Sequence, residues 1–215
     1  METEETVKEE CVAMSKTKRI WLAFVDIVLF TVLFMIFLFL FAIPFAIAFP
    51  ELKTQVGGMS VYLMMLNEVL MLASGLIAAC MVLGFRKLPF SGLGLSLKGW
   101  GRSLLNGALF VVFLYAVGFG LSLLLGAVEV AGVLFSPISL LASLLLYFLV
   151  AVTEEVIGRG FILGRMLDGG VNKFVALLIS AVLFSLMHLF NPSFAFVPFL
   201  NIMLAGCFLG ASYIY

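Results

Sequence analysis

The chain has 215 residues, of which 64% are hydrophobic and only 11% are charged. A soluble domain is roughly 45–50% apolar and about 25% charged, so this composition excludes a water-soluble globular protein and predicts a membrane protein with several spans. Twelve basic and twelve acidic residues cancel, which gives no support for a nucleic-acid partner. The three cysteines (Cys11, Cys80, Cys207) are scattered and indicate neither a disulfide framework nor a Cys-ligated metal site.

Charged residues are concentrated at the N-terminus. Nine of the 24 charged residues lie within residues 1–19, which we predict to form a polar cytoplasmic N-terminal tail. No internal repeat of fixed period divides the remainder. Residues 20–215 are therefore predicted to form a single integral-membrane helical domain.

Six apolar stretches follow the tail, each close to the roughly 20 residues that a helix needs to cross a bilayer. None alternates with a period of two, which argues against a β-barrel and favours helices. The predicted fold class is therefore all-α, a polytopic membrane bundle of about six transmembrane helices. The predicted spans are residues 20–49, 61–85, 104–128, 138–164, 174–190 and 194–215.

The orientation follows from the lysines and arginines near the ends of the spans, because basic residues gather on the cytoplasmic side. Ten of them would lie on one side and only Lys53 on the other, which predicts a cytoplasmic N-terminus. The ten are Lys16, Lys18, Arg19, Arg86, Lys87, Lys98, Arg102, Arg159, Arg165 and Lys173.

The strongest concentration of ionisable residues inside a span is the sequence TEEVIGRG, residues 153–160. A charge in the apolar core is costly unless it is paired or hydrated, so each such residue is a functional hypothesis. Glu155 and Arg159 are four residues apart and can form an ion pair. Glu154 is turned from them by about 100° and is left free to activate water as a general base. Alternatively, the segment only marks the cytoplasmic end of the fourth span, although the apolar sequence FIL follows it directly.

His188 is the only histidine of the chain and lies in an apolar stretch predicted to be helical, four residues after Phe184. A single histidine in such a stretch is more often a hydrogen-bonded core residue than a catalytic one. Its combination with Glu154 reverses this preference, because a carboxylate and an imidazole could hold one water molecule between them. A zinc site commonly has several histidines. We therefore predict no cofactor, and a divalent metal ion stays an open alternative.

Two further acids, Asp26 and Glu68, lie in predicted spans, and Asn67 precedes Glu68. Glu68 could be a partner of the site residues or a packed, protonated acid, and we favour the structural role. The same two acids are the basis for a small transporter, an interpretation that lacks the inverted repeat or paired broken helices expected of many transporters.

The motifs Glu154-Glu155-x-x-x-Arg159 and Phe184-x-x-x-His188 resemble the EExxxR and FxxxH motifs of the CPBP intramembrane proteases, the CAAX-prenyl-protease and bacteriocin-immunity-like family. The segments LGLSLKGW, TEEVIGRGFILGRML and LNIMLAGCFLG are also similar, so the resemblance covers roughly residues 83–215. EExxxR alone is a weak motif, but the two motifs in this order, in successive spans, are fairly specific.

The resemblance implies an intramembrane endopeptidase in which Glu154 activates water, His188 assists it, and Glu155 and Arg159 organise the site. Eukaryotic members act on prenylated C-terminal peptides, whereas many bacterial members are linked to bacteriocin immunity or peptide processing. The implied partners are a peptide or protein substrate and the lipid bilayer, and the implied location is a bacterial-type plasma membrane. The alternative within the same fold is a non-catalytic scaffold or bacteriocin-immunity protein.

The chain departs from the family in one respect. Members usually carry a third motif, HxxxN or a variant, in a further helix, and this sequence has no second histidine before Tyr215. We therefore expect the chain to be truncated at its C-terminus relative to the family, without the groups that would stabilise an oxyanion. Asn201 could contribute a polar contact in the last span, but no family role is transferred to it.

Helix lengths place a geometric condition on the site. At a rise of about 1.5 Å per residue, Glu154 lies about 24 Å from the outer start of its span, and His188 lies roughly 22 Å from the cytoplasmic start of the next. They meet only if the fourth helix continues past Leu163 or the fifth starts below the membrane surface. A separation of more than about 8 Å would remove the geometric basis of catalysis.

Overall fold

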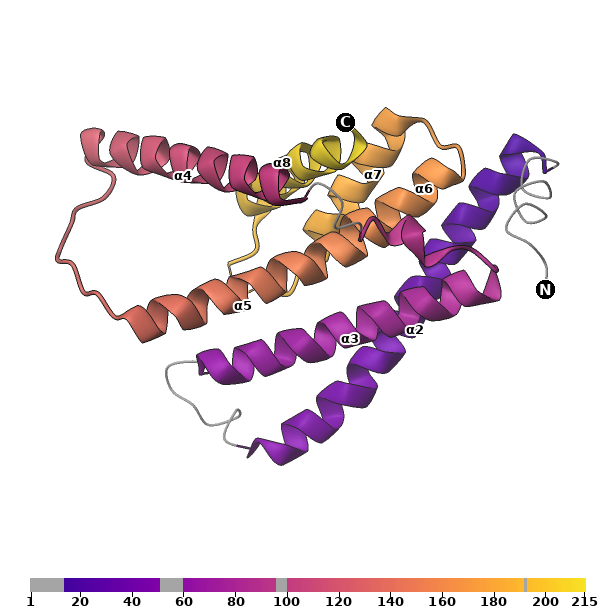
Figure 1. Ribbon diagram of the computed structural model, residues 1–215, viewed down its shortest axis with the longest axis horizontal. Coiled ribbons are helices and arrows are strands. Elements are labelled where there is room, and N and C mark those ends of the chain that lie inside the picture. The colour runs from indigo at the N-terminus through magenta and orange to yellow at the C-terminus, as the bar shows by residue number, and fades with distance from the viewer. Residues whose placement is uncertain (1–13, 51–59, 96–99, 192) are drawn as a thin grey trace. The chain divides into compact units, whose positions relative to one another are not determined.

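A computed structural model describes residues 14–50, 60–95, 100–191 and 193–215 (Figure 1). The helices are α2 (Lys16–Ala48), α3 (Val61–Phe85), the 3₁₀-helix η2 (Phe90–Leu93), α4 (Trp100–Leu124), α5 (Pro137–Glu155), the π-helix η3 (Val156–Leu163), α6 (Gly164–Asp168), α7 (Lys173–Leu186) and α8 (Phe196–Ile214). No strand occurs in these residues, which confirms the all-α class. Helix α2 begins inside the predicted tail, and residues 1–13 of that tail lie outside the described residues.

Five of the described helical segments are long and apolar enough to cross a membrane. They are Lys16–Ala48, Val61–Phe85, Gly101–Leu124, Pro137–Asp168 and Phe196–Ile214, as expected of a polytopic helical membrane protein. The sixth, α7, has only 14 residues. It ends before residue 190 because Asn191 precedes a proline, and the residue before proline avoids the α conformation. The expected span over residues 174–190 is therefore too long.

Contacts divide the chain into two compact units. The first comprises residues Met1–Leu95 and Ala142–Tyr215 and carries both sequence motifs. The second, residues Ser96–Leu141, contains α4 and the start of α5. Taken by itself, α4 is an apolar helix whose side chains are nearly all exposed from Gly101 onward, as expected of a surface that faces lipid.

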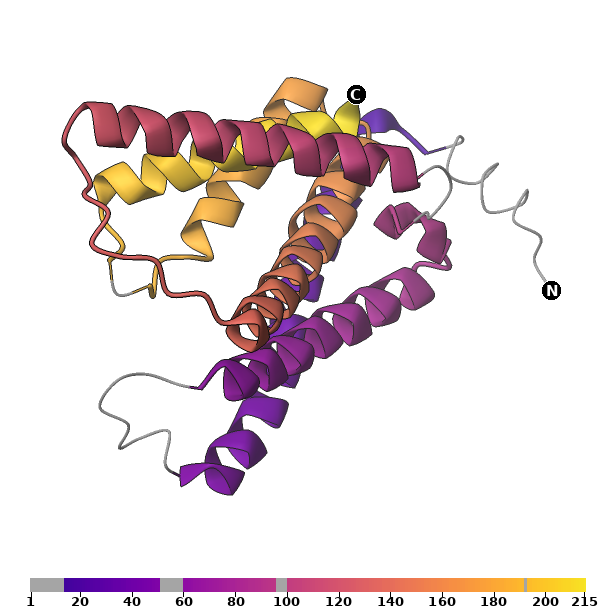
Figure 2. The ribbon, with the colours of Figure 1, turned by 60° about the vertical axis from the view of Figure 1, so that its left-hand side comes forward.

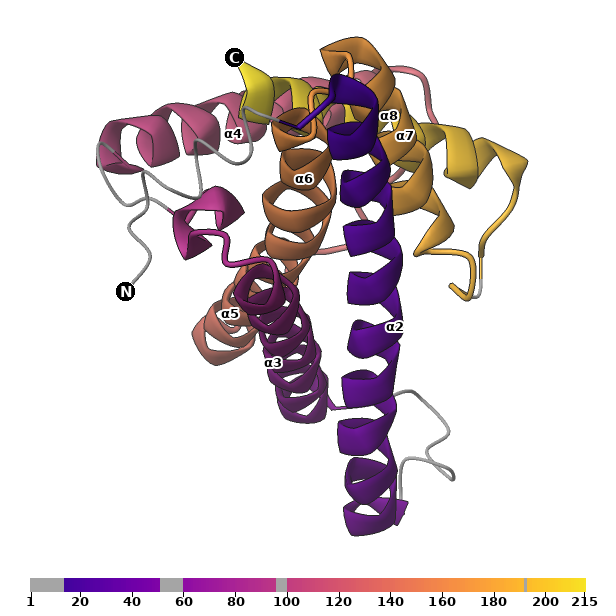
Figure 3. The same ribbon diagram turned by 90° about the vertical axis from the view of Figure 1, so that its right-hand side faces the viewer.

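The core of the first unit forms where η3 meets the N-terminal helices. Helix α2 lies along α3 and α6 (Figure 3), and the rings of Phe30 in α2 and Phe161 in η3 stack with centroids 4.1 Å apart. On the other side, α8 packs closely on α7, because a Cβ atom added at Gly206 would lie only 3.1 Å from the Cα atom of Ala181. Small residues at such contacts allow helix backbones to approach each other in a membrane. The π-helix is thus held between two helix pairs.

Asp26, an acid in a predicted span for which the sequence identified no partner, is fully buried and paired with two arginines. Its Oδ1 accepts a hydrogen bond of 2.6 Å from Nε of Arg86, and its Oδ2 accepts one of 2.8 Å from Nη2 of Arg165. Arg165 also forms a longer ion pair, 3.4 Å, with the exposed Asp168. Asp26 therefore ties α2 to the end of α3 and to α6, which continues the helix that carries both glutamates.

Replacing Asp26 with asparagine keeps the shape of the side chain and removes the charge that both arginines face. We expect Asp26→Asn to lower the free energy of unfolding by about 3 kcal/mol, because it removes the counter-charge that Arg86 and Arg165 share and leaves Arg165 only its longer ion pair with Asp168. Asp168→Asn is the matched control, since the Asp168 side chain is 59% exposed, and it should change stability little. Thermal unfolding in mild detergent, followed by circular dichroism, measures both. Equal stability of the two variants would contradict this role.

Candidate active site

Both glutamates of the first motif lie in the last turn of α5, immediately before the π-helix. A π-helix is wider than an α-helix and is often found at functional sites. All eight residues of η3 are buried, and Oγ of Ser180 in α7 donates a hydrogen bond of 3.3 Å to the carbonyl oxygen of Gly158. Since α6 carries the same helix on to Asp168, the fourth helix continues past Leu163. One of the two conditions for bringing Glu154 near His188 is therefore met.

Glu155 and Arg159 form the ion pair that their spacing predicts, with Nη1 of Arg159 3.1 Å from Oε1 of Glu155. The Arg159 side chain is only 2% exposed, whereas that of Glu155 is 46% exposed. The guanidinium carbon of Arg159 also lies 4.4 Å from the ring centroid of Phe184. An arginine over an aromatic face gains a cation–π attraction. The buried charge is thus balanced by a carboxylate and by an aromatic ring.

His188 lies in a turn just after α7, so the prediction that it is deep in a helix is wrong. Its backbone N–H donates to the carbonyl oxygen of Ser185 at 3.1 Å, and its own carbonyl oxygen accepts from Asn191 at 3.0 Å. These bonds span three residues, as in a 3₁₀ turn. The sequence signal that was overlooked is the Asn-Pro pair at residues 191–192, which favours a turn.

The structure brings Glu154 and His188 together, with Oε1 of Glu154 3.4 Å from Nε2 of His188. This is well inside the limit of about 8 Å set above. Nδ1 of His188 lies 2.8 Å from the carbonyl oxygen of Phe184. A carbonyl oxygen can only accept a hydrogen bond, so Nδ1 carries a proton. Nε2 is then the ring nitrogen that faces the carboxylate of Glu154.

Phe184 joins the two motifs. One side of its ring faces Arg159, and its ring centroid is 5.0 Å from that of His188 in an edge-to-face arrangement. Glycines leave room for the ring, since a Cβ atom added at Gly158 or Gly206 would lie 3.7 or 3.3 Å from it. Phe184 of the FxxxH motif thus contacts both Arg159 of the first motif and His188 of the second.

For Glu68, the sequence leaves open a partner of the site residues or a packed, protonated acid, and we favour the structural role. Glu68 lies in α3, and its Oε2 atom is buried without a hydrogen-bond partner among the described residues. The sequence signal for it is an acid inside an apolar helix, as for Glu154, but nothing in the sequence pairs α3 with α5. Asn201, by contrast, is exposed on α8.

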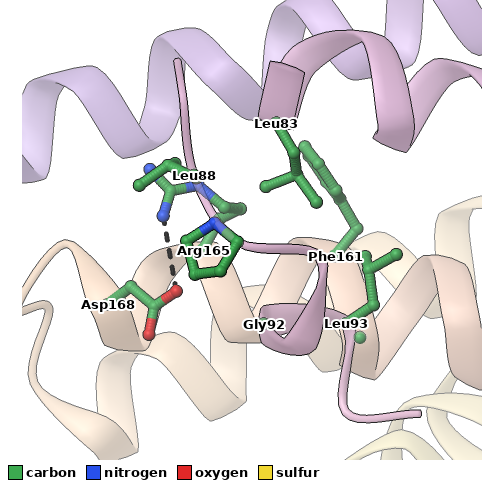
Figure 4. A pocket seen from close by; sticks show the side chains of 9 residues that line it. Leu83, Leu88, Gly92, Leu93, Phe161, Arg165 and Asp168 are labelled. Atoms are coloured by element: carbon green, nitrogen blue, oxygen red, sulfur yellow. Dashed lines mark hydrogen bonds and ion pairs between the residues drawn. The ribbon is translucent and has the colours of Figure 1, made fainter. Parts of the chain in front are cut away.

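A small cavity lies apart from these residues, between the end of α3, η2 and the start of α6 (Figure 4). Its volume is about 40 Å³, enough for water but not for a peptide. Arg165 and Asp168 form its polar wall and Leu83, Leu88 and Phe161 much of the rest. Within the described ranges, no three His, Cys, Asp or Glu side chains are grouped so that they could hold a metal ion.

Comparison with protein families gives a match to the C-terminal part of the chain. Residues 135–215 match the family described as type II CAAX prenyl endopeptidase, Rce1-like. The match contains both motifs and α8, and it confirms the family resemblance over this part of the chain; the segment LGLSLKGW, which also suggested the family, lies before it. Neither the curated proteins nor the solved structures gave a match.

The π-helix predicts a sharp difference between two neighbouring glycines. A Cβ atom at Gly160 would lie 2.6 Å from the carbonyl oxygen of Leu93, whereas one at Gly158 meets nothing closer than 3.7 Å. We expect Gly160→Ala to lower the free energy of unfolding by about 1–3 kcal/mol, the usual cost of overpacking. Gly158→Ala is the matched control and should leave stability unchanged or slightly raised. Thermal unfolding in detergent measures both, and a stable Gly160→Ala protein would disprove the close contact with η2.

Proposed function

We propose that this protein is an intramembrane endopeptidase of the CAAX-protease type, which hydrolyses peptide bonds within or near the bilayer. The match of residues 135–215 to the Rce1-like family supports this class of reaction. The observation that carries the proposal is the contact of 3.4 Å between Glu154 and His188. It supports a mechanism in which the carboxylate acts as a general base and the neighbouring imidazole as a proton donor.

The proton count assigns a role to each member of the pair. With the shared proton on Nε2 of His188, Glu154 is ionised and accepts a proton from water as the water oxygen attacks the peptide carbonyl carbon. The imidazolium then gives its Nε2 proton to the leaving amine as the C–N bond breaks. Finally, Glu154 returns its proton to Nε2. One water is consumed, and a carboxylic acid and an amine are formed.

Exposure supports the same division of roles. The side chains of Glu154 and His188 are 30% and 22% exposed, so a substrate can reach both, whereas Arg159 is only 2% exposed. Arg159 therefore positions other groups instead of touching the peptide. Its ion pair keeps Glu155 turned away from Glu154, and its contact with Phe184 supports the ring that lies against His188.

The setting of the reaction follows from the sequence. The excess of basic residues near one set of span ends supports an orientation with a cytoplasmic N-terminus. The substrate would then be a peptide or protein held in or beside the membrane, and the family resemblance supports a bacterial-type plasma membrane.

The test uses the full chain in liposomes with an internally quenched fluorescent peptide that ends in a farnesylated cysteine followed by three residues. We expect the wild-type protein to cleave it and the Glu154→Gln and His188→Ala variants to be slower by about 10²-fold or more, the usual contribution of a general base or acid. The same peptide without the farnesyl group shows whether the lipid is required.

Glu129→Gln is the matched control, because Glu129 is exposed and lies in the second unit. It should cleave at the wild-type rate. Wild-type protein that cleaves neither peptide, or a Glu154→Gln variant that retains the wild-type rate, would overturn the proposal and leave a non-catalytic role for the fold.

A further inference from the structure

The described residues include one buried carboxylate oxygen near the candidate site that the mechanism above does not use, Oε2 of Glu68. The large majority of buried side-chain polar atoms in proteins have a hydrogen-bond partner, in the protein or in ordered water. A carboxylate oxygen without a partner in an apolar helix is costly. A hydrogen bond donated to Oε2 of Glu68 would remove that cost.

The face of α3 that carries Glu68 packs on the catalytic helix. Gly75 follows Glu68 by seven residues, which is two helical turns, and so shares its face. A Cβ atom added at Gly75 would lie 3.2 Å from the side chain of Ile157, three residues after Glu154. Helices α3 and α5 run in the same direction (Figures 1 and 2), so both glutamates precede this contact. This geometry places Glu68 on the Glu154 side of the helix pair.

The charges of the site also call for a neutral hydrogen-bond donor. Glu68, Glu154 and Glu155 are three acids, and among the described residues the basic side chains paired with this group are Arg159 and His188. Arg159 is paired with Glu155, and His188 with Glu154. Glu68 has neither partner, and its Oε2 accepts no hydrogen bond from a described residue. A molecule that donates hydrogen bonds to both Glu68 and Glu154 would satisfy the orphaned oxygen and separate the two acids.

We propose that Glu68 is a further catalytic residue, which holds the nucleophilic water against Glu154. This inference rests on the proposed function. One O–H of the water donates to Glu154, which takes that proton during attack, and the other donates to Oε2 of Glu68. The two hydrogen bonds leave a lone pair of the water oxygen directed at the peptide carbonyl. Glu68 keeps its own protonation state throughout, so the proton balance of the hydrolysis is unchanged.

Two substitutions of similar size separate this role from a structural one. Glu68→Gln retains an oxygen that accepts a hydrogen bond from water, whereas Glu68→Leu retains the bulk and loses the acceptor. Leucine suits an apolar helix, so the Leu variant should fold at least as well as the wild type. In the liposome assay we expect kcat to fall about 10²-fold in Glu68→Leu, a loss comparable to that of one oxyanion-hole donor. Glu68→Gln should retain most of kcat, with KM unchanged in both.

Asn67→Ala is the control on the adjacent face of the same helix and should leave kcat unchanged. Equal kcat in the Glu68→Gln, Glu68→Leu and wild-type proteins would overturn the role of Glu68. The proposed function would still be supported if Glu154→Gln lost activity in the same assay. An increase in KM alone in the Leu variant would also overturn it, because that result indicates substrate binding and not activation of water.

A second measurement does not depend on turnover. A crystal structure of the full chain that resolves ordered water should show one water within hydrogen-bond distance of both Oε2 of Glu68 and the carboxylate of Glu154, and Glu68→Leu should lose it. A structure in which Glu68 Oε2 bonds to a protein atom, or in which no water touches both acids, would overturn the inference even if the enzyme proves active.

Discussion

In the proposed mechanism, the hydrogen bond from Nδ1 of His188 to the carbonyl oxygen of Phe184 fixes the chemistry of the whole site. Phe184 lies in the last turn of α7, where helix carbonyls have no partner within the helix. The ring of His188 supplies that partner, and this leaves Nε2 directed at Glu154. The Asn-Pro pair at residues 191–192 favours the turn in which His188 lies. A local feature of the chain thereby helps to set which imidazole nitrogen faces Glu154, and we propose that the two groups share a proton.

Charge in an apolar surrounding is the second constraint, and several ionisable groups in the interior of the first unit are paired with one another. Asp26 binds two arginines, Arg159 binds Glu155 and the ring of Phe184, and Glu154 binds His188. The π-helix links these groups, since Arg159 lies within it and Glu154 immediately before it. Its buried glycines allow η2 and α7 to pack against its backbone, so the helix that bears the base has little freedom to move. Fixed groups of this kind are what a reaction within a membrane requires.

The sequence predicted the parts of this arrangement that depend on local spacing. The apolar stretches predicted a helical membrane protein, and the spacing of Glu155 and Arg159 predicted their ion pair. Contacts between distant segments were less accessible: those of Asp26 with Arg86 and Arg165 depend on how α2 packs on α3 and α6, which no local pattern encodes. The π-helix η3 was also not predicted, because Glu155 and Arg159 can form an ion pair in an ordinary α-helix as well. The roles of Glu154, Glu155, Arg159 and His188 in catalysis stay predictions.

The most direct test of the shared proton is ¹⁵N NMR of the imidazole in protein labelled at histidine, because His188 is the only histidine in the chain. At a pH where the ring is neutral, the account predicts that Nδ1 carries the proton and Nε2 does not, the reverse of the tautomer that free histidine prefers in water. Glu154→Gln should change the chemical shift of Nε2 far more than that of Nδ1. A neutral ring protonated at Nε2, or an Nε2 signal that does not respond to Glu154→Gln, would contradict the central claim that Glu154 and His188 act as one proton-holding pair.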